Sequence, residues 1–216
     1  MKNQNKIKLF VDFIKHRLNK PLPGIEAQKI MAPFAGKEYF RTFEPSETAH
    51  KSAVLVLLSL QNNTLQLVFT LRSNNISHSG QISFPGGKYE DFETAEMTAL
   101  RETREEIGIS TDNIILLGRL TGLFVPPSDT IIIPVVGYTE NIYGIDSNND
   151  EVEEVFFVPF DKFIGEKNKK NEVWDFKGID VEVPFWDIHP TTPLWGATAM
   201  ILIELITLYD EFTEEH

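Results

Sequence analysis

The chain has 216 residues and a formal net charge of −12, with 20 Lys and Arg against 32 Asp and Glu. Its length is typical of one domain, and its hydrophobic content of 42% is sufficient for a core. The acidic balance argues against nonspecific nucleic-acid binding, which depends on Lys and Arg. The absence of cysteine excludes disulfides, zinc–thiolate sites and thiol catalysis.

No apolar run is long enough for a membrane span, and the N-terminal segment lacks the features of a signal peptide. We therefore expect a cytoplasmic protein. Residues 1–47 read as an N-terminal helical extension, followed by a domain over residues 48–210. The extension begins with an amphipathic helix that we expect to dock on its own domain, and its apolar residues are Ile7, Phe10, Val11, Phe13, Ile14 and Leu18.

The domain begins with two apolar segments that predict a β-hairpin. Ala53–Leu58 is a continuous apolar run, typical of a buried strand, and Leu65–Arg72 is a second strand after the turn at Gln61–Asn63. A polar loop then covers Asn74–Gly80. A short strand at Gln81–Phe84 leads into a Pro-Gly-Gly turn, where glycines permit close approach of the backbone to a ligand or metal.

A helix is predicted immediately after this turn. Thr94 is the expected N-cap and Gly108 the expected C-cap. Small and apolar residues form a stripe that would dock the helix on the core, namely Ala95, Ala99, Thr103 and Ile107.

The other face of this helix carries Glu102, Glu105 and Glu106. Residues three and four apart lie on one helix face, so these carboxylates repel one another by a few tenths of a kcal/mol per pair, roughly. A divalent cation would remove this repulsion, and Mg²⁺ prefers carboxylate, water and phosphate oxygens. The triplet alone is equally compatible with a solvated charged face.

The remainder of the chain alternates strands and loops before a final helix. Strands are expected over Asn113–Phe124, Thr130–Tyr138 and Val155–Val158, with an acidic loop at Asn141–Asp150. A short helix is expected from Pro159, a basic turn at Lys167–Asn171, a hairpin over Glu172–Val183 and a helix over Gly196–Tyr209. This order predicts a mixed α/β domain.

The segment from Gly87 to Ile109 resembles the Nudix box, G-x5-E-x7-R-E-U-x-E-E-x-G-U, in which U is apolar. Glu93, Arg101-Glu102, Glu105-Glu106 and the flanking Gly and Ile all match, and only Thr103 departs, mildly, at an apolar position. The resemblance implies a Nudix-type α/β/α sandwich with a mixed β-sheet. It also implies hydrolysis of a nucleoside diphosphate compound with Mg²⁺ or Mn²⁺.

Segments outside the box are similar to the coenzyme A pyrophosphatase branch of this superfamily. The stretch Val68–Gly87 resembles its signature through Thr70, Arg72, Ser73, Gly80 and Phe84, although the loop arginine of the stricter signature is missing. Three downstream segments also resemble the branch, at Ile131–Tyr138, Glu151–Phe160 and Pro193–Ile201.

The resemblance and the residues together define a candidate site. Glu102 and Glu106 are the leading metal ligands, followed by Glu105 and the Gly86 carbonyl. Arg101 is expected to pair with Glu93 and orient the ligands. Glu105 is the first candidate for the general base, ahead of Glu151, Glu153 and Glu154.

Arg72, Lys88 and Gly87 are the candidates for substrate binding. Arg72 would hold a phosphate, with a structural ion pair as the alternative. Lys88 would touch phosphate or be solvated. His78 is expected to have a loop role, and His189 and Trp195 are expected to pack.

The leading functional hypothesis is cleavage of coenzyme A or acyl-coenzyme A to 3′,5′-ADP and 4′-phosphopantetheine or its acyl form. One alternative is another nucleoside diphosphate substrate, such as ADP-ribose, NADH or a dinucleoside polyphosphate. The other is a non-catalytic Nudix-fold binding module, against which the intact box argues. A small-molecule substrate is the expected partner, without nucleic acid or a membrane span, and a homodimer is left open.

Overall fold

The computed structural model describes every residue except 1, 37, 40, 74–79, 148–149 and 216. The predicted loop at Asn74–Gly80 therefore lies almost entirely outside the described residues, together with His78. The helices of the described part are α1 (Lys2–Arg17), α2 (Ile25–Lys29), α3 (Ala95–Ile107) and α4 (Gly196–Glu215). None of these helices is long and apolar enough to cross a membrane.

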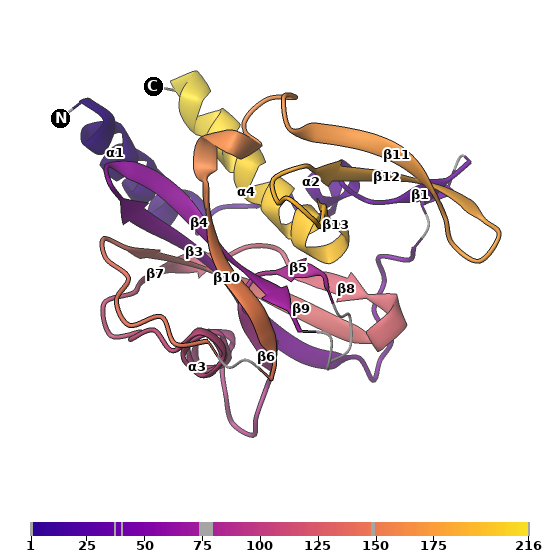
Figure 1. Cartoon of the computed structure of the whole chain (residues 1–216), viewed down its shortest axis with the longest axis horizontal. Helices are drawn as coiled ribbons and strands as arrows, with labels where there is room; N and C mark the ends of the chain where they lie inside the picture. Colours follow the sequence, from indigo (N-terminus) through magenta and orange to yellow (C-terminus); the bar gives the residue numbers. More distant parts are fainter. Residues whose placement is uncertain (1, 37, 40, 74–79, 148–149, 216) are drawn as a thin grey trace.

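The larger β-sheet has the order β10-β4-β3-β9-β7, with β5 on β4, β6 on β3 and β8 on β9 (Figure 1). Its strands are β3 (His50–Gln61), β4 (Thr64–Arg72), β5 (Ile82–Ser83), β6 (Gly86–Lys88), β7 (Ile115–Arg119), β8 (Leu123–Val125), β9 (Thr130–Thr139) and β10 (Val152–Pro159). The β3–β4 pair is the predicted antiparallel hairpin. Since β3 pairs in parallel with β9, the sheet is mixed, as predicted.

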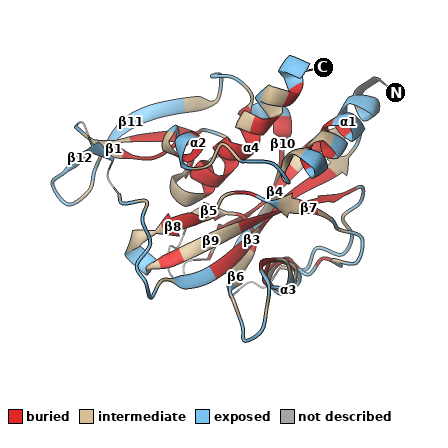
Figure 2. Ribbon diagram, turned by 180° about the vertical axis from the view of Figure 1, so that it is seen from behind, coloured by how far each residue is buried: buried red, intermediate tan, exposed pale blue. Residues whose placement is uncertain are grey.

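Helices cover both faces of this sheet, because side chains alternate along β3. Leu55 and Leu57 belong to a core cluster with Ala99 and Ile107 of α3, on one face. Val56 and Leu58 join the larger cluster beneath α1 and α4, on the other. Figures 1 and 2 show α3 separated from α1 and α4 by the sheet, and Figure 2 shows buried residues where these layers meet. The α/β/α sandwich is confirmed.

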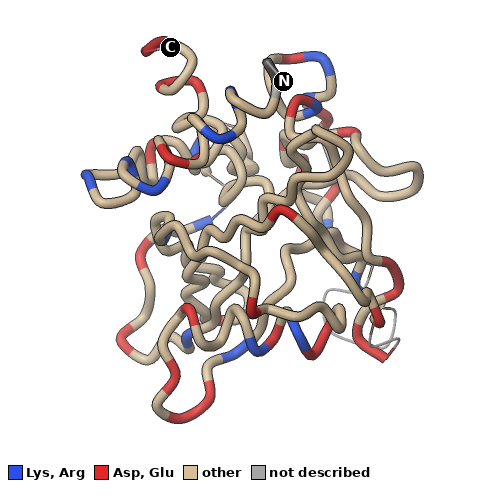
Figure 3. The backbone as a smooth tube through the Cα atoms, turned by 90° about the vertical axis from the view of Figure 1, so that its left-hand side faces the viewer, with Lys and Arg blue, Asp and Glu red and all other residues tan. Residues whose placement is uncertain are grey.

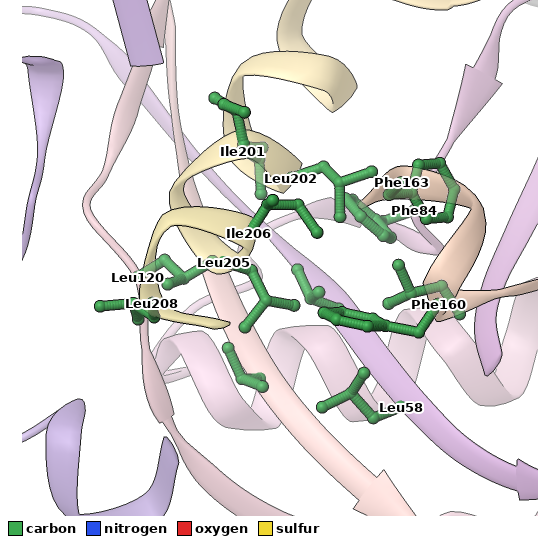
Figure 4. Packing of buried hydrophobic residues seen from close by; sticks show 14 of the residues in the cluster. Leu58, Phe84, Leu120, Phe160, Phe163, Ile201, Leu202, Leu205, Ile206 and Leu208 are labelled. Atoms are coloured by element: carbon green, nitrogen blue, oxygen red, sulfur yellow. The ribbon is translucent and has the colours of Figure 1, made fainter. Parts of the chain in front are cut away.

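The larger core cluster is built around α4. Leu202, Leu205 and Ile206 of α4 face Phe84 and Phe160 across the layer (Figure 4). From α1, Phe10 and Ile14 are almost fully buried in the same cluster. The N-terminal helix therefore docks on its own domain, as expected from its apolar pattern.

A smaller sheet lies beside α4, in the order β11-β12-β1-β2 with β13 on β12. Its strands are β1 (Phe34–Ala35), β2 (Glu38–Tyr39), β11 (Lys169–Asp175), β12 (Asp180–Trp186) and β13 (Leu194–Trp195). The β11–β12 pair confirms the predicted hairpin, which turns through Lys177 and Gly178 at positive φ. Phe34 pairs with Glu182, so the N-terminal segment contributes to this sheet. The boundary at residue 47 stays a prediction.

Some predicted boundaries were wrong. The strand expected over Asn113–Phe124 is divided into β7 and β8, because the Thr121 amide donates to Glu204 of α4 instead of to the sheet. The basic turn is shorter than expected, because Lys169 already pairs with Trp186 in β11. The elements α2, β1 and β2 were not predicted, because they are too short to show a hydrophobic period. The predicted short helix is the 3₁₀ turn Phe160–Phe163.

Candidate active site

The site is built on α3, whose ends are the ones that the sequence predicts. Thr94 is the N-cap, with its side chain accepting a hydrogen bond from the Met97 amide at 3.4 Å. Gly108 is a left-handed C-cap with φ of 70°. A Cβ at this position would lie 2.5 Å from the Asp146 carbonyl oxygen, so a larger residue is doubly disfavoured.

The predicted apolar stripe of α3 is buried against β3 and fixes the rotation of the helix. Ala95, Ala99, Thr103 and Ile107 are all buried. Thr103, the one departure from the family pattern, donates its hydroxyl to the Ala99 carbonyl at 2.6 Å. Its polar group is thus satisfied within the helix while its methyl packs, so the departure leaves the site geometry intact.

Gly86 and Gly87, where the sequence predicts a turn, lie instead in strand β6, which pairs with β3 and packs against α3. The Gly86 amide donates to the Glu106 carboxylate at 2.9 Å. A Cβ on Gly86 would lie 2.3 Å from the Ala53 carbonyl oxygen, in the neighbouring strand. A Cβ on Gly87 would lie 2.3 Å from the Glu102 Cδ. Position 86 therefore requires glycine, whereas a side chain at Gly87 would displace the Glu102 carboxylate. Each glycine places one carboxylate against β6.

Arg101 links the acidic residues of the box. It donates to Glu93 at 2.7 Å, to Glu102 at 2.9 Å and to Glu105 at 3.1 Å, and also to the Lys88 carbonyl at 3.0 Å. The predicted Arg101–Glu93 pair is therefore present. Hydrogen bonds from Arg101 hold the pKa of Glu93 at about 2, well below its usual range.

Sequence reasoning missed Thr98, whose hydroxyl donates to the same Glu93 carboxylate at 2.7 Å. Thr98 lies in the first turn of α3, shortly after Glu93 in the sequence, and this proximity could have indicated the contact. Glu93 also accepts the Glu90 amide at 3.0 Å, so three groups hold its carboxylate in place. Figure 3 shows acidic and basic residues next to one another in the lower part of the molecule, where Figure 1 places α3.

Glu102 and Glu106 are the two carboxylates of the box whose pKa values are raised. The pKa of Glu106 is raised to about 7, chiefly by burial and in part by the nearby Glu102 and Glu151 carboxylates, against the opposing hydrogen bond from the Gly86 amide. Burial also raises the pKa of Glu102, and the Glu105 and Glu151 charges act in the same direction. Like charges held together in a buried position favour a cation or protons.

Glu151 and Arg72 reach this cluster through the β4–β10 pairing. Arg72 lies opposite Val152, and the Ser73 amide donates to the Glu151 carbonyl at 2.9 Å. The Arg72 charge lowers the pKa of Glu106, opposing the effect of burial. The pairing thus brings one cation and one additional carboxylate to the buried glutamates.

The other candidates lie less centrally. The side chain of Glu105 is 53% exposed beside Arg101, and Glu153 is exposed at a bulge in β10. Glu154 is within 3.2 Å of the His189 ring, and the Lys88 side chain is exposed. His189 is buried against Phe156, while Trp195 packs edge-on against Trp174, as their packing roles predict.

The donor chemistry fits a divalent cation. Glu102 and Glu106 offer hard oxygen ligands, and the Gly86 amide occupies only one side of the Glu106 carboxylate. Within the described ranges, no three or more Asp, Glu, His or Cys side chains are grouped closely enough to bind a metal ion by themselves. Mg²⁺ does not require such a group, since it commonly binds through one or two carboxylates, water and substrate phosphates.

Comparison with known proteins agrees with this geometry. A family model described as the NUDIX domain matches residues 49–180. The chain is 28% identical over 204 residues to Nudix hydrolase 3 of Caenorhabditis elegans, covering 87% of this chain and 85% of that protein. A crystal structure of the Mycobacterium smegmatis Nudix hydrolase RenU matches with a TM-score of 0.51 and 14% identity, over 75% of this chain and 87% of that one.

Two further relatives have a named substrate. The chain is 38% identical over 119 residues to the peroxisomal coenzyme A diphosphatase NUDT7 of Mus musculus, covering 54% of this chain and 50% of that protein. It is 32% identical over 155 residues to the human mitochondrial coenzyme A diphosphatase NUDT8, covering 69% and 65%. The chain thus spans less than two thirds of either of these relatives. From the box, its geometry and the family match, the chain belongs to the NUDIX family and is a Nudix hydrolase.

Proposed function

We propose that the protein hydrolyses the pyrophosphate of coenzyme A or acyl-coenzyme A. Water attacks one phosphorus atom, a new P–O bond forms, and the bridging P–O bond breaks. The products are 3′,5′-ADP and 4′-phosphopantetheine, or its acyl form. The similarity to NUDT7 and NUDT8 supports this substrate, as do the branch-like segments of the sequence.

The position of Arg72 carries the proposal. It belongs to the Thr70–Ser73 segment of the branch signature, and β4 places its charge near Glu106. A guanidinium beside the metal-binding carboxylates binds a phosphate of the substrate while the cluster binds the other. Lys88 and the Gly87 backbone, on the neighbouring strand β6, complete the proposed phosphate-binding set.

Mg²⁺ or Mn²⁺ is the proposed cofactor, with Glu102 and Glu106 as its principal ligands and Glu105 and the Gly86 carbonyl as further candidates. When bound, the cation neutralises the diphosphate and polarises its oxygens. Arg101 and Glu93 hold Glu102 and Glu105 in orientation through the hydrogen bonds described above.

The attacking water must lose a proton, and a carboxylate of the site accepts it. Glu105 remains the first candidate because of its place in the box. Glu151 gains support over Glu153 and Glu154, because its charge acts on both Glu102 and Glu106. The side chain of Glu151 is exposed to solvent beside Glu102 and Glu106, which suits the role of general base.

The alternative substrates are separated by one assay. The purified protein with Mg²⁺ is incubated with coenzyme A, ADP-ribose, NADH and dinucleoside polyphosphates, and products are identified by mass spectrometry. We expect the highest kcat/KM for coenzyme A. A higher value for ADP-ribose would overturn the coenzyme A assignment and leave Nudix hydrolysis intact, whereas binding without any turnover would favour a non-catalytic module.

Two further assignments accompany this proposal. We assign the reaction to the cytoplasm, and fractionation of cells tests the location independently of the names of the peroxisomal and mitochondrial relatives. A homodimer stays a separate hypothesis, which sedimentation of the purified protein tests.

A further inference from the structure

A pocket of about 520 Å³ lies beside β10 and apart from the box. One wall is formed by Glu154 and Phe156–Pro159 of β10, and the other by Asp187–Pro190, the segment that follows β12. Lys162 and Asn168 complete the lining. Its volume is in the range of pockets that hold small organic ligands.

The pocket lies along the same strand pairing that positions Arg72. Along β10, Val152 lies opposite Arg72, Glu154 lies opposite Leu71, and Pro159 lies opposite Gln66. The β10 wall therefore begins just beyond Arg72 and runs away from it. At roughly 3.4 Å per residue, its length from Glu154 to Pro159 is about 17 Å. A substrate held by its phosphates at Arg72 can extend an arm along this wall.

The pocket is lined by two carboxylates and one lysine, which disfavours an anionic group. Glu154 and Asp187 line it together with Lys162, and Asp187 is already paired with Lys170 at 2.5 Å. The Thr191 amide faces His189 Nδ1 at 3.4 Å and can only donate. His189 Nε2 therefore carries the proton and donates to Glu154 at 3.2 Å. A neutral polar ligand suits these walls better than a phosphate.

The backbone of β10 adds a specific recognition element. In the described part of the chain, β10 pairs with β4 and with no other strand, so it is an edge of the larger sheet. An edge strand presents unpaired N–H and C=O groups that pair with an extended amide-containing chain. The Phe156 ring, packed at 4.9 Å on His189, and Pro190 offer apolar surface beside them.

We propose that this pocket binds the pantetheine arm of the substrate, laid along the edge of β10. Pantetheine is uncharged, and its two secondary amides are separated by methylene groups. The amides would pair with the β10 backbone while the methylenes contact Phe156 and Pro190. This inference rests on the proposed function and deepens it, because it assigns a separate part of the protein to the part of coenzyme A that ADP-ribose lacks.

The test uses the two product halves as separate probes. Pro190→Trp places a large side chain at the exposed border of the pocket, and Pro45→Trp makes the same change at an exposed position on another loop. Calorimetry measures 4′-phosphopantetheine and 3′,5′-ADP binding to each variant and to the parent. We expect Pro190→Trp to weaken 4′-phosphopantetheine about tenfold and to leave 3′,5′-ADP unchanged, with Pro45→Trp changing neither.

A second measurement uses the unmodified protein. Adding 4′-phosphopantetheine should shift the backbone amide resonances of Phe156–Val158, and 3′,5′-ADP should not. The assignment is overturned if 3′,5′-ADP shifts these resonances instead, or if 4′-phosphopantetheine leaves them unmoved. Should the parent cleave coenzyme A while this test fails, only the pocket assignment is lost. If the parent protein does not cleave coenzyme A, both the proposed substrate and the pocket assignment are wrong.

Discussion

At the scale of single residues, the two glycines of β6 have different roles although they are adjacent. The space for a Cβ on Gly86 is taken by backbone of β3, and Gly86 also has φ of 154°. The space on Gly87 is taken by the end of the Glu102 side chain, which can move. Substitution should therefore damage the fold at one position and the metal site at the other.

We expect Gly87→Ala to fold with a melting temperature near that of the parent and to bind Mn²⁺ at least about tenfold more weakly, near 1.4 kcal/mol. Gly86→Ala should instead lower the melting temperature strongly, since backbone cannot yield to the new Cβ. Thermal unfolding and metal titration by calorimetry measure both effects. Parental metal affinity in Gly87→Ala would show that Glu102 is not a ligand.

Arg101 and Glu93 are predicted to act as one unit in orienting the ligands. Arg101→Ala and Glu93→Ala should each reduce metal affinity about ten- to a hundredfold. This is the usual effect of removing a residue that holds a metal ligand in place by a hydrogen bond. The double variant should lose less than the sum of both free energies, because the 2.7 Å contact between the residues is already broken in each single variant. Strict additivity in the metal titrations would mean that the pair does not orient the site as a unit.

At the scale of elements, Glu204 joins α4 to two other segments. Its fully buried carboxylate accepts the Gly24 amide at 2.9 Å, the Thr121 amide at 3.0 Å and the Thr121 hydroxyl at 2.6 Å. Glu204→Gln turns an NH₂ group toward one of these donors. We expect a loss of about 2 kcal/mol in the free energy of unfolding, measured with urea. Glu214→Gln, at an exposed position of the same helix, should change little; an equal effect of the two would contradict the role of Glu204.

The pair between Glu96 of α3 and Arg119 of β7 predicts a dependence of stability on pH. Hydrogen bonds from Arg119, at 2.6 Å, hold the pKa of Glu96 at about 2, against about 4.3 in an unfolded chain. Because the folded-state pKa is the lower one, the pair stabilises the fold above about pH 4.3. That stabilisation is lost as the pH falls toward 2.

The pair is partly exposed, so its contribution at pH 7 should be at most about 1 kcal/mol. Glu96→Gln should therefore be less stable than the parent at pH 7, and the difference should shrink between pH 4.3 and pH 2. Urea unfolding at a series of pH values measures this difference. A difference in stability that stays constant down to pH 2 would show that the ionised carboxylate of Glu96 does not stabilise the fold through Arg119.

The elements also show which parts of the fold are readable from sequence. The caps of α3 at Thr94 and Gly108 were predicted correctly, because capping depends on residues within a few positions. The break between β7 and β8 was not, because it depends on Thr121 meeting Glu204 from a distant helix. Short strands such as β1 form only through pairing with β12, which no local pattern reveals.

At the scale of the whole molecule, the layers bring distant segments to the box. The resemblance to the Nudix box, together with its residues, predicted the Arg101–Glu93 contact. It did not distinguish Glu151 from Glu153 and Glu154, because that choice depends on the β4–β10 register. The pocket beside β10 was also not predicted, because its walls come from segments that are separated by β11 and β12.

The central claim is that the carboxylate cluster around Glu106 performs metal-dependent hydrolysis of coenzyme A. Its most direct test is the rate of coenzyme A cleavage, followed by mass spectrometry, in the parent, in Glu106→Gln and in the exposed control Glu140→Gln. Chelation should abolish cleavage by the parent, and Mg²⁺ or Mn²⁺ should restore it. Glu106→Gln should lower kcat at least about a hundredfold, near 2.7 kcal/mol in barrier, with the control unchanged. Full activity of Glu106→Gln, or parental activity that survives chelation, would contradict the account.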